Sequence, residues 1–366
     1  MNDVTQLAQI VPRLASMCGV GDYAHLLSVE LQHQQKMRSC FLIVEENWAE
    51  SFQKEGQKFR LSRRSNQENW ADLEGQPLAG MVLQYSGYGY ARRGAPVWLL
   101  RTLRSFRSRF PQVPMITMFH EVAASGPVSS SAFWLLPVQR YVARRLRVLS
   151  DISITNCAAN ARELERLSDL RMRGLEILPV FSNFGEGDGM PWTQRVRRMV
   201  VFSSNFGGQV PACSFWQELA DAACAVNATE VTIIGRPVKV PPDFNCPVMQ
   251  PGFLESEAVS AILATSAFGY VFHGLFLLGK SGIFAAFAAH GVVPLVQTSS
   301  ASLPDGLVGG MTYHALRHAR PMGDNAAYFE QIRRNILEWY RPHNLAATAA
   351  FYAGLLERHQ FHGERV

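Results

Sequence analysis

His120 and Glu121 follow an apolar run at Met115–Phe119, so both side chains are expected at the carboxyl end of a buried strand. Open α/β sheets bind their ligands at that edge. A histidine titrates near neutral pH, so His120 can exchange a proton or bond to a hydroxyl group. For Glu121 the sequence leaves three roles open, namely a general base, a partner of His120 and a surface carboxylate.

A glycine-rich segment contains Gly19, Val20 and Gly21 and opens a predicted helix at Asp22. Glycines let backbone N–H groups approach a phosphate, and the start of a helix adds positive partial charge. Asp22 or a neighbour is expected to cap the helix, and Asp22 is a third candidate for catalysis. The segment lacks the third glycine of a dinucleotide fingerprint and the Gly-Lys-Ser/Thr of a P-loop, so a plain turn is the alternative.

Lys280, Ser281 and Gly282 precede an alanine-rich helical stretch in the second half of the chain. A lysine beside the first turn of a helix suits an anion such as a diphosphate. Lysine is rare in this sequence, which favours a role for Lys280 in binding. The alternative is that Ser281 only caps the helix and Lys280 is solvated.

Two further residues follow predicted strands of the second half. Arg236 comes after the run Val231–Ile234, where a guanidinium group can reach a diphosphate. Ser204 lies in a Ser/Gly loop after Met199–Phe202 and is a candidate phosphate contact. Both signals have low specificity, because a surface arginine and a plain loop explain them equally well.

Short apolar runs alternate with helix-like stretches through the first half of the chain. Runs such as Phe41–Val44 lack polar alternation, as do strands that are buried on both faces. This repetition predicts a doubly wound parallel sheet. The predicted strands are Leu7–Leu14, Cys40–Val44, Gly80–Gln84, Pro114–Phe119 and Ile152–Thr155, with a weak strand at Lys58–Leu61, and the predicted helices are Asp22–Gln35, Pro96–Arg109, Ser130–Leu149 and Ala158–Leu170.

A second α/β pattern begins after a stretch rich in glycine and polar residues. We therefore expect an N-terminal domain at 1–181, a linker at 182–198, a C-terminal domain at 199–340 and a final helix at 341–366. The predicted fold class is α/β, with two facing Rossmann-like domains and a C-terminal helix that returns toward the first domain.

The order of these segments resembles the GT-B-fold glycosyltransferases, in particular a divergent member of family 4, also called group 1. The segment Cys18–Tyr23 is similar to their first glycine-rich loop, and Phe119–Glu121 to the His-Asp/Glu pair beside the reacting sugar. The segments Ser150–Leu164 and Val231–Arg236 resemble the family's strands before the linker and in the C-terminal domain. Ser281–Val296 resembles its donor-binding helix.

The resemblance implies transfer of a sugar from a nucleoside-diphosphate sugar to a hydroxyl acceptor, such as a glycan or a lipid-linked saccharide. His120, Glu121 and Asp22 would be the catalytic candidates. The donor would be bound by Gly19, Val20, Gly21, Ser204, Arg236, Lys280, Ser281 and Gly282. Enzymes of this fold need neither a metal nor a cofactor, so none is expected here.

One departure from the family pattern concerns its pair of glutamates, which lie eight positions apart in retaining members. The corresponding positions here are Leu278 and Ala286, and both are apolar. The segment Lys280–Gly282 would then carry more of the diphosphate binding. The alternative is a catalytically inactive GT-B-like scaffold that binds nucleotide sugars without turnover.

Composition excludes several other classes of protein. The 366 residues are 48% hydrophobic and 18% charged, which is unlike disordered chains, collagens or coiled coils. The longest apolar run is shorter than the roughly 18–20 residues of a membrane-spanning helix. The six cysteines lack the spacing of a zinc knuckle or a redox pair. Met1–Ile10 does not resemble a secretion signal, so a cytoplasmic protein is expected.

The net charge of +5 divides into +6 for residues 1–180 and −1 for residues 181–366. The segment Arg92–Arg109 holds six arginines and no acidic residue, and Trp98, Leu99, Leu103 and Phe106 interleave with them. Such a basic amphipathic helix suggests contact with the anionic inner face of the cell membrane. A solvated arginine face is the alternative. Nucleic acid is not expected as a partner, because no known binding module is present.

Overall fold

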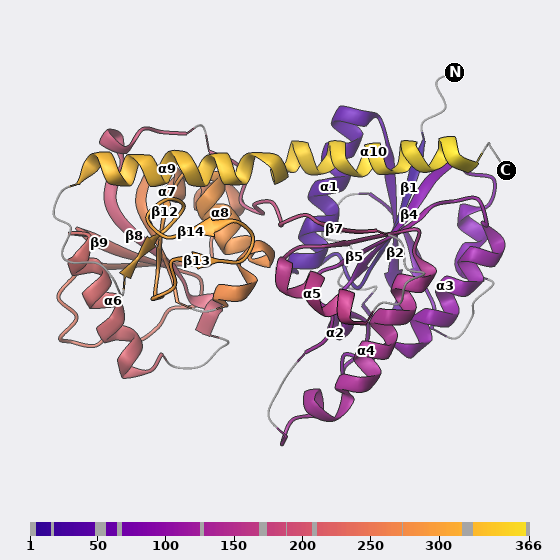
Figure 1. Cartoon of the computed structure of the whole chain (residues 1–366), viewed down its shortest axis with the longest axis horizontal. Helices are drawn as coiled ribbons and strands as arrows, with labels where there is room; N and C mark the ends of the chain where they lie inside the picture. Colours follow the sequence, from indigo (N-terminus) through magenta and orange to yellow (C-terminus); the bar gives the residue numbers. More distant parts are fainter. Residues whose placement is uncertain are drawn as a thin grey trace. The chain divides into compact units, whose positions relative to one another are not determined.

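The chain forms two compact units in the computed structural model (Figure 1). Unit 1 comprises Met1–Pro179 and Leu345–Val366, and unit 2 comprises Val180–Asn344. The structure describes residues 5–15, 18–47, 56–63, 68–124, 128–167, 174–187, 189–206, 211–272, 274–316 and 325–363.

In its described residues, unit 1 contains a parallel sheet in the order β3-β2-β1-β4-β5-β6-β7. The strand order reverses between β1 and β4, as in other doubly wound sheets. The strands are β1 (Gln6–Val11), β2 (Arg38–Val44), β3 (Gln57–Leu61), β4 (Leu78–Tyr85), β5 (Met115–Phe119), β6 (Ile152–Thr155) and β7 (Leu175–Ile177). The helices are α1 (Gly19–Gln35), α2 (Gly87–Tyr90), α3 (Val97–Arg109), α4 (Ser131–Leu149), α5 (Ala158–Arg166) and α10 (Leu345–Gly363).

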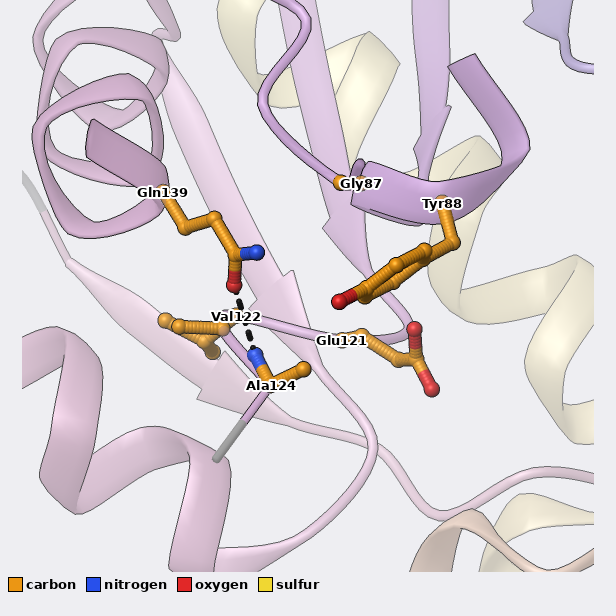
Figure 2. A pocket seen from close by; sticks show the side chains of 8 residues that line it. Gly87, Tyr88, Glu121, Val122, Ala124 and Gln139 are labelled. Atoms are coloured by element: carbon orange, nitrogen blue, oxygen red, sulfur yellow. Dashed lines mark hydrogen bonds between the residues drawn. The ribbon is translucent and has the colours of Figure 1, made fainter. Parts of the chain in front are cut away.

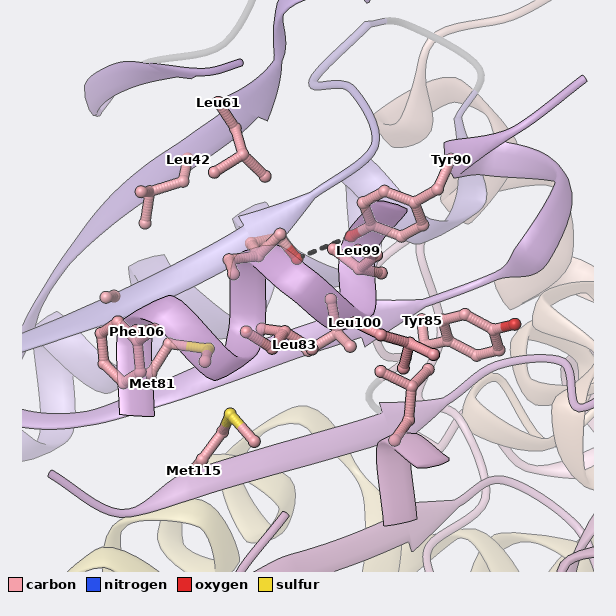
Figure 3. Packing of buried hydrophobic residues seen from close by; sticks show 14 of the residues in the cluster. Leu42, Leu61, Met81, Leu83, Tyr85, Tyr90, Leu99, Leu100, Phe106 and Met115 are labelled. Atoms are coloured by element: carbon pink, nitrogen blue, oxygen red, sulfur yellow. Dashed lines mark hydrogen bonds between the residues drawn. The ribbon is translucent and has the colours of Figure 1, made fainter. Parts of the chain in front are cut away.

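Buried apolar side chains pack on both faces of this sheet. On one face, Leu42, Met81 and Leu83 of the strands pack against Leu100 and Phe106 of α3 (Figure 3). A smaller cluster joins β1 and β2 to α1 on the other face. Because both faces are covered, the strands carry apolar residues without polar alternation, as the sequence indicated.

The last helix of the chain, α10, belongs to unit 1 and packs on α1 and β4. Tyr352 of α10 is fully buried, and its hydroxyl lies against that of Tyr23 of α1. A Cβ on Gly80 of β4 would lie 2.3 Å from a methyl carbon of Leu356. The final helix therefore completes the hydrophobic core of unit 1, although unit 2 precedes it in sequence.

Unit 2 repeats the architecture with a parallel sheet in the order β10-β9-β8-β11-β12-β15, counted over its described residues. Its order reverses between β8 and β11. The strands are β8 (Val196–Phe202), β9 (Glu230–Ile234), β10 (Val248–Gly252), β11 (Ser266–Val271), β12 (Val293–Val296) and β15 (His314–Ala315), beside a hairpin of β13 (Ser302–Leu303) and β14 (Leu307–Val308). The helices are α6 (Cys213–Ala225), α7 (Ser256–Thr265), α8 (Gly282–Ala289) and α9 (Ala326–Tyr340).

Several boundaries differ from the sequence prediction. Strand β1 ends at Val11 rather than Leu14, because Pro12 has no N–H to continue the ladder. The predicted extension of a helix to Leu170 lies outside the described residues. The short strands β7 and β10 were not predicted, because β7 has only three residues and β10 contains Pro251 and Gly252.

The segment predicted as a linker, 182–198, packs onto unit 2 in its described part. The Ser182 N–H donates to the Tyr340 hydroxyl at 2.9 Å, and the Gly187 N–H donates to the Ala289 carbonyl at 3.1 Å. Residues from Val196 onward already belong to β8. The boundary between the compact units therefore lies before Val180. Asp188, within this segment, lies outside the described residues.

The junction between β1 and α1 requires one of its two glycines. A Cβ on Gly21 would lie 2.5 Å from the carbonyl oxygen of Arg13, and that oxygen belongs to the backbone. A Cβ on Gly19 would meet no atom within 4 Å. Gly21 therefore allows α1 to approach the loop after β1, whereas Gly19 leaves open space above the first turn.

We expect Gly21→Ala to destabilise the protein and Gly19→Ala, its matched control, to change stability little. Overpacking against a backbone that cannot yield typically costs about 1–3 kcal/mol. Urea unfolding, followed by circular dichroism, compares the midpoints of the two variants. Equal midpoints for the two variants would contradict the close approach of Gly21 to Arg13.

Candidate functional site

The carboxyl ends of β1 and β4 form the switch point of unit 1. The Tyr90 hydroxyl bridges the two strands, at 2.9 Å from the carbonyl oxygen of Ile10 and 3.0 Å from that of Gln84. A Cβ on Gly89, in the loop after β4, would lie 2.8 Å from the side chain of Pro12. The two loops that leave the switch point are therefore packed closely together.

Helix α1 begins at this edge with Cys18 as its N-cap rather than Asp22, and the cap side chain makes no capping bond. The Asp22 N–H donates the first bond of the helix to the Cys18 carbonyl, at 2.7 Å. The N–H groups of Gly19, Val20 and Gly21 therefore lie outside the hydrogen-bond ladder of the helix. Asp22 lies in the first turn, where its charge complements the positive end of the helix. Met17, the residue before the cap, lies outside the described residues.

His120 lies at the end of β5 and is buried. Its N–H donates to the Tyr85 carbonyl at 2.9 Å, and its own carbonyl accepts from the side-chain amides of Asn156 and Asn160 at 3.2 and 3.4 Å. The rings of Tyr23 and His120 meet in a T-shaped pair with centroids 5.0 Å apart. Contacts from α1, β4 and the β6–α5 region thus fix both the backbone and the ring of His120.

A chain of buried amides runs from α1 across β1 and β4 to His120. Gln9 Nε2 donates to the Ala24 carbonyl at 3.4 Å and to Ser39 Oγ at 3.0 Å. Gln84 Nε2 donates to Gln9 Oε1 at 3.0 Å, and Gln84 Oε1 lies 2.9 Å from His120 Nε2. Neither glutamine is exposed. An unsatisfied buried polar group costs about 1–3 kcal/mol, so this chain of bonds has one favourable direction.

The direction of the amide chain assigns the tautomer of His120. A backbone carbonyl only accepts hydrogen bonds, so Gln9 turns its NH₂ group to Ala24 and its oxygen to Gln84. Gln84 then turns its own oxygen to His120, and Nε2 of His120 must carry the proton. In the neutral imidazole the lone pair is therefore on Nδ1, which is the nitrogen that can accept a proton.

Glu121 lines a small pocket of unit 1 with Tyr88 and Gln139 (Figure 2). Its carboxylate accepts a hydrogen bond from Ser86 Oγ at 3.1 Å, in the loop after β4. Gln139 of α4 accepts from the Ala124 N–H at 2.8 Å and so fixes the loop that follows Glu121. Glu121 is thus placed beside the switch-point loop, whereas the His120 ring bonds to Gln84.

At the corresponding edge of unit 2, the loops after β8 and β9 touch. Gly235 has a φ of 110°, which favours glycine, and a Cβ there would lie 2.6 Å from Ser203 Oγ. Ser204 and Arg236 follow these two residues, and both are exposed. The structure therefore places these two donor-binding candidates on neighbouring loops. Gly207–Gly208, from the same predicted loop as Ser204, lie outside the described residues.

Helix α8 begins at the third loop of this edge, after β11. Ser281 is its N-cap, and the Ser281 hydroxyl accepts from the Phe284 N–H at 3.2 Å. The N–H groups of Gly282 and Ile283 remain outside the ladder of the helix, in a position that suits an anion. Lys280 is half-buried directly before the cap. The two alternatives for Ser281 are therefore compatible, since it caps the helix and leaves two N–H groups for a ligand.

The two positions expected to correspond to the glutamate pair, Leu278 and Ala286, belong to the core of unit 2. Leu278 is 3% exposed, and Ala286 is fully buried within α8. A carboxylate at Ala286 would be desolvated and would oppose the packing of the helix. This chain therefore holds no ribose ligand at either position.

The apolar side chains of α3 do not form a surface. They pack into the core of unit 1 and are Leu99, Leu100, Leu103 and Phe106. Arg107 pairs with Asp151 at 2.5 Å, and Arg109 pairs with Glu74 at 2.6 Å. The apolar side of Arg92–Arg109 therefore belongs to the core and is not available to a membrane. Arg92, Arg93, Arg101 and Arg104 are exposed, and their contact with a membrane stays a prediction. In the described part of the chain, no helix is long and apolar enough to cross a membrane.

Sequence reasoning missed the residues that position His120. Gln9 and Gln84 interrupt apolar strands with a polar side chain, which is a signal that a functional network leaves in a sequence. Tyr23 and Tyr90 gave no such signal, since aromatic residues are common in cores. Of the predicted site residues, Gly19–Asp22, His120 and Glu121 belong to unit 1, and Ser204, Arg236 and Lys280–Gly282 belong to unit 2.

The sequence matches no protein-family model and no curated protein. Solved structures, however, share its fold over nearly the whole chain. A UDP-forming trehalose-phosphate synthase from Burkholderia vietnamiensis is 11% identical, with a TM-score of 0.60 over 99% of this chain and 100% of that one. An α-glucosyltransferase in complex with UDP is 8% identical, with a TM-score of 0.57 over 96% and 99%. HepE from Anabaena, in complex with UDP and glucose, is 8% identical, with a TM-score of 0.55 over 97% and 100%.

These similarities show that the chain has the GT-B glycosyltransferase fold. The predicted fold class is thereby confirmed, with two Rossmann-like α/β units and a C-terminal helix that contacts α1. At identities of 8–11% the similarity is one of fold.

We expect ¹⁵N NMR of the histidine rings to show a proton on Nε2 of neutral His120 and none on Nδ1. In Gln84→Met the acceptor is lost, so both tautomers should be populated and stability should fall by about 1–3 kcal/mol. Gln34→Met, at an exposed position of α1, is the matched control and should leave the spectrum of His120 unchanged. A proton on Nδ1 in the unmodified protein would refute the assignment.

Proposed function

We propose that the protein is a metal-independent glycosyltransferase that transfers a sugar from a nucleoside-diphosphate sugar to a hydroxyl acceptor. Three similar structures support this proposal, since one is a UDP-forming synthase and two are complexes with UDP.

The start of α8 is the observation that carries the proposal. The N–H groups of Gly282 and Ile283 lie outside the helix ladder, and Lys280 precedes the cap. Both the backbone dipoles and the ammonium group favour a diphosphate, whose negative charge grows as the sugar departs. Arg236 and Ser204, on the neighbouring loops, are proposed as further contacts to the donor.

His120 is the proposed base of unit 1. The acceptor hydroxyl would give its proton to Nδ1, while its oxygen forms a bond to the anomeric carbon of the sugar. The bond from that carbon to the diphosphate oxygen breaks, and the nucleoside diphosphate leaves with the electron pair. Glu121 and Asp22 are the second candidates for the base. The N–H groups of Gly19, Val20 and Gly21 are proposed as additional donors to the phosphates.

The acceptor that we favour is a glycan or a lipid-linked saccharide, in polysaccharide or glycolipid assembly. The net charge of +6 over residues 1–180 supports this choice, since many carriers of such acceptors are anionic. We place the protein at the cytoplasmic face of the membrane on the same grounds.

A second candidate function is a nucleotide-sugar-binding scaffold without turnover. The burial of apolar Leu278 and Ala286, at the positions of the family's glutamate pair, is the observation that favours it. The scaffold and the enzyme differ in one measurable respect, because only the enzyme releases a nucleoside diphosphate from the donor.

We expect Lys280→Ala to weaken the binding of nucleoside diphosphates by about 10- to 100-fold, the loss typical of one charge-assisted hydrogen bond. Lys239→Ala is the matched control, since Lys239 is an exposed lysine of the same unit. Calorimetric titration with UDP and with other nucleoside diphosphates measures both variants. Equal affinities in the two variants would remove Lys280 from the donor site.

We expect His120→Ala to lower kcat by at least about 10²-fold while the affinity for nucleoside diphosphate changes less than threefold, because a general base acts on the acceptor side. The measurement is the initial rate of nucleoside-diphosphate release in the presence of acceptor. Loss of both properties together would instead indicate a structural role for His120. Donor binding without turnover in the unmodified protein would favour the scaffold.

A further inference from the structure

The first two turns of α4, residues 131–138, are apolar but contain no buried side chain. Their sequence is Ser-Ala-Phe-Trp-Leu-Leu-Pro-Val, and the buried residues of the helix begin only at Gln139. In Figure 1 this end of α4 extends away from the sheet of unit 1. We call residues 131–138 the α4 tip. The tip adds nothing to the core, so its apolar character needs another explanation.

Two aromatic side chains dominate the α4 tip. Trp134 is 68% exposed and Phe133 is 42% exposed, which is unusual for large apolar side chains. The indole N–H of Trp134 donates to the Val128 carbonyl at 2.8 Å, and the rings of Phe133 and Trp134 form a T-shaped pair with centroids 5.4 Å apart. The aromatic cluster is therefore held in an exposed arrangement by specific contacts.

An exposed stripe continues from the tip along the helix. Pro137, Tyr141 and Val148 lie three, seven and fourteen residues after Trp134, and all three are exposed. Residues at such spacings share one face of a helix. Tryptophan and tyrosine on an exposed face are typical of the interface between water and lipid, where one end of the ring is apolar and the other is wet.

The surroundings of the tip are basic. The sequence from Val122 to Ser150 contains no acidic residue. Arg144 is exposed on α4, and Arg140 is exposed while it pairs with Glu163 at 2.6 Å. Arg92 and Arg93 are also exposed and lie beside α4, because Gln139 Nε2 donates to the Arg93 carbonyl at 3.2 Å. Arg144 therefore lies on the same helix as the aromatic stripe, and the backbone of Arg93 lies against Gln139 of that helix.

We infer that the α4 tip docks on an anionic lipid bilayer, with Phe133 and Trp134 in the interfacial region and the arginines against the lipid phosphates. Exposed aromatics beside exposed arginines, on a helix that has no acidic residue of its own, are complementary to an anionic membrane surface. A stable protein interface would need roughly 800 Å² per partner, whereas two projecting turns suit insertion between lipid headgroups. The α4 tip thus takes the place of the apolar side of α3 as the surface that enters the membrane, because that side of α3 lies in the core. Membrane binding by the tip does not depend on glycosyl transfer.

The test is flotation of the full chain with phosphatidylglycerol vesicles and with phosphatidylcholine vesicles. We expect binding to the anionic vesicles only, and a loss of binding between 0.1 M and 1 M salt, where the Debye length falls from about 10 Å to about 3 Å. Phe133→Ala/Trp134→Ala should lower the bound fraction at least about tenfold. Phe253→Ala, at an exposed aromatic residue of unit 2, is the matched control and should not change it.

Quenching by brominated lipids tests the depth of Trp134 directly. Trp134→Phe keeps an aromatic ring, so it should still bind vesicles but lose most of the quenching of tryptophan fluorescence. The inference would be overturned if the unmodified protein did not bind anionic vesicles at low salt, or if it and the double alanine variant bound them equally. It would also be overturned if light scattering showed a dimer that is lost in the double alanine variant but kept in Phe253→Ala. The double variant should keep its thermal midpoint, because neither side chain is buried.

Discussion

The amide chain from Ala24 through Gln9 and Gln84 to His120 is the constraint on which the geometry of unit 1 depends. It joins α1, β1, β4 and β5 in a region without solvent, where each polar group must find a partner. The backbone carbonyl of Ala24 can only accept a hydrogen bond, and this fixes the direction of every hydrogen bond in the amide chain. A helix and three strands therefore determine which nitrogen of a single imidazole carries a proton.

The two units share one topology but present different side chains at the corresponding edge. Each has a parallel sheet whose strand order reverses once, and in each the candidate residues lie on loops at the carboxyl ends of strands. In unit 1 the edge holds a histidine of defined tautomer beside the start of α1. In unit 2 the edge holds Lys280, Arg236 and the start of α8, which together favour an anion. The proposed function assigns the base to the edge of unit 1 and the binding of the nucleoside-diphosphate sugar to the edge of unit 2.

The sequence predicted much of the fold and less of the site. Phe41–Val44 and the alanines of α8 identified buried elements, because their apolar patterns depend on local burial alone. The amide chain could not be predicted, since Gln9 and Gln84 are 75 residues apart and only the sheet brings them together. The apolar face of α3 was assigned to a membrane because the same helical period serves a core and a lipid surface. The helical spacing of apolar residues shows that a helix has an apolar face. Whether the protein core or a membrane covers that face is known only from the tertiary structure.

The central claim is that this protein cleaves a nucleoside-diphosphate sugar and transfers the sugar. Phosphorus NMR of the full chain, incubated with a panel of nucleoside-diphosphate sugars and mixed glycan acceptors, tests this most directly. We predict that the diphosphate diester signals of one donor are replaced by those of the free nucleoside diphosphate, at a rate that rises with acceptor concentration. Donors that all remain intact, while the protein binds a nucleoside diphosphate, would contradict it.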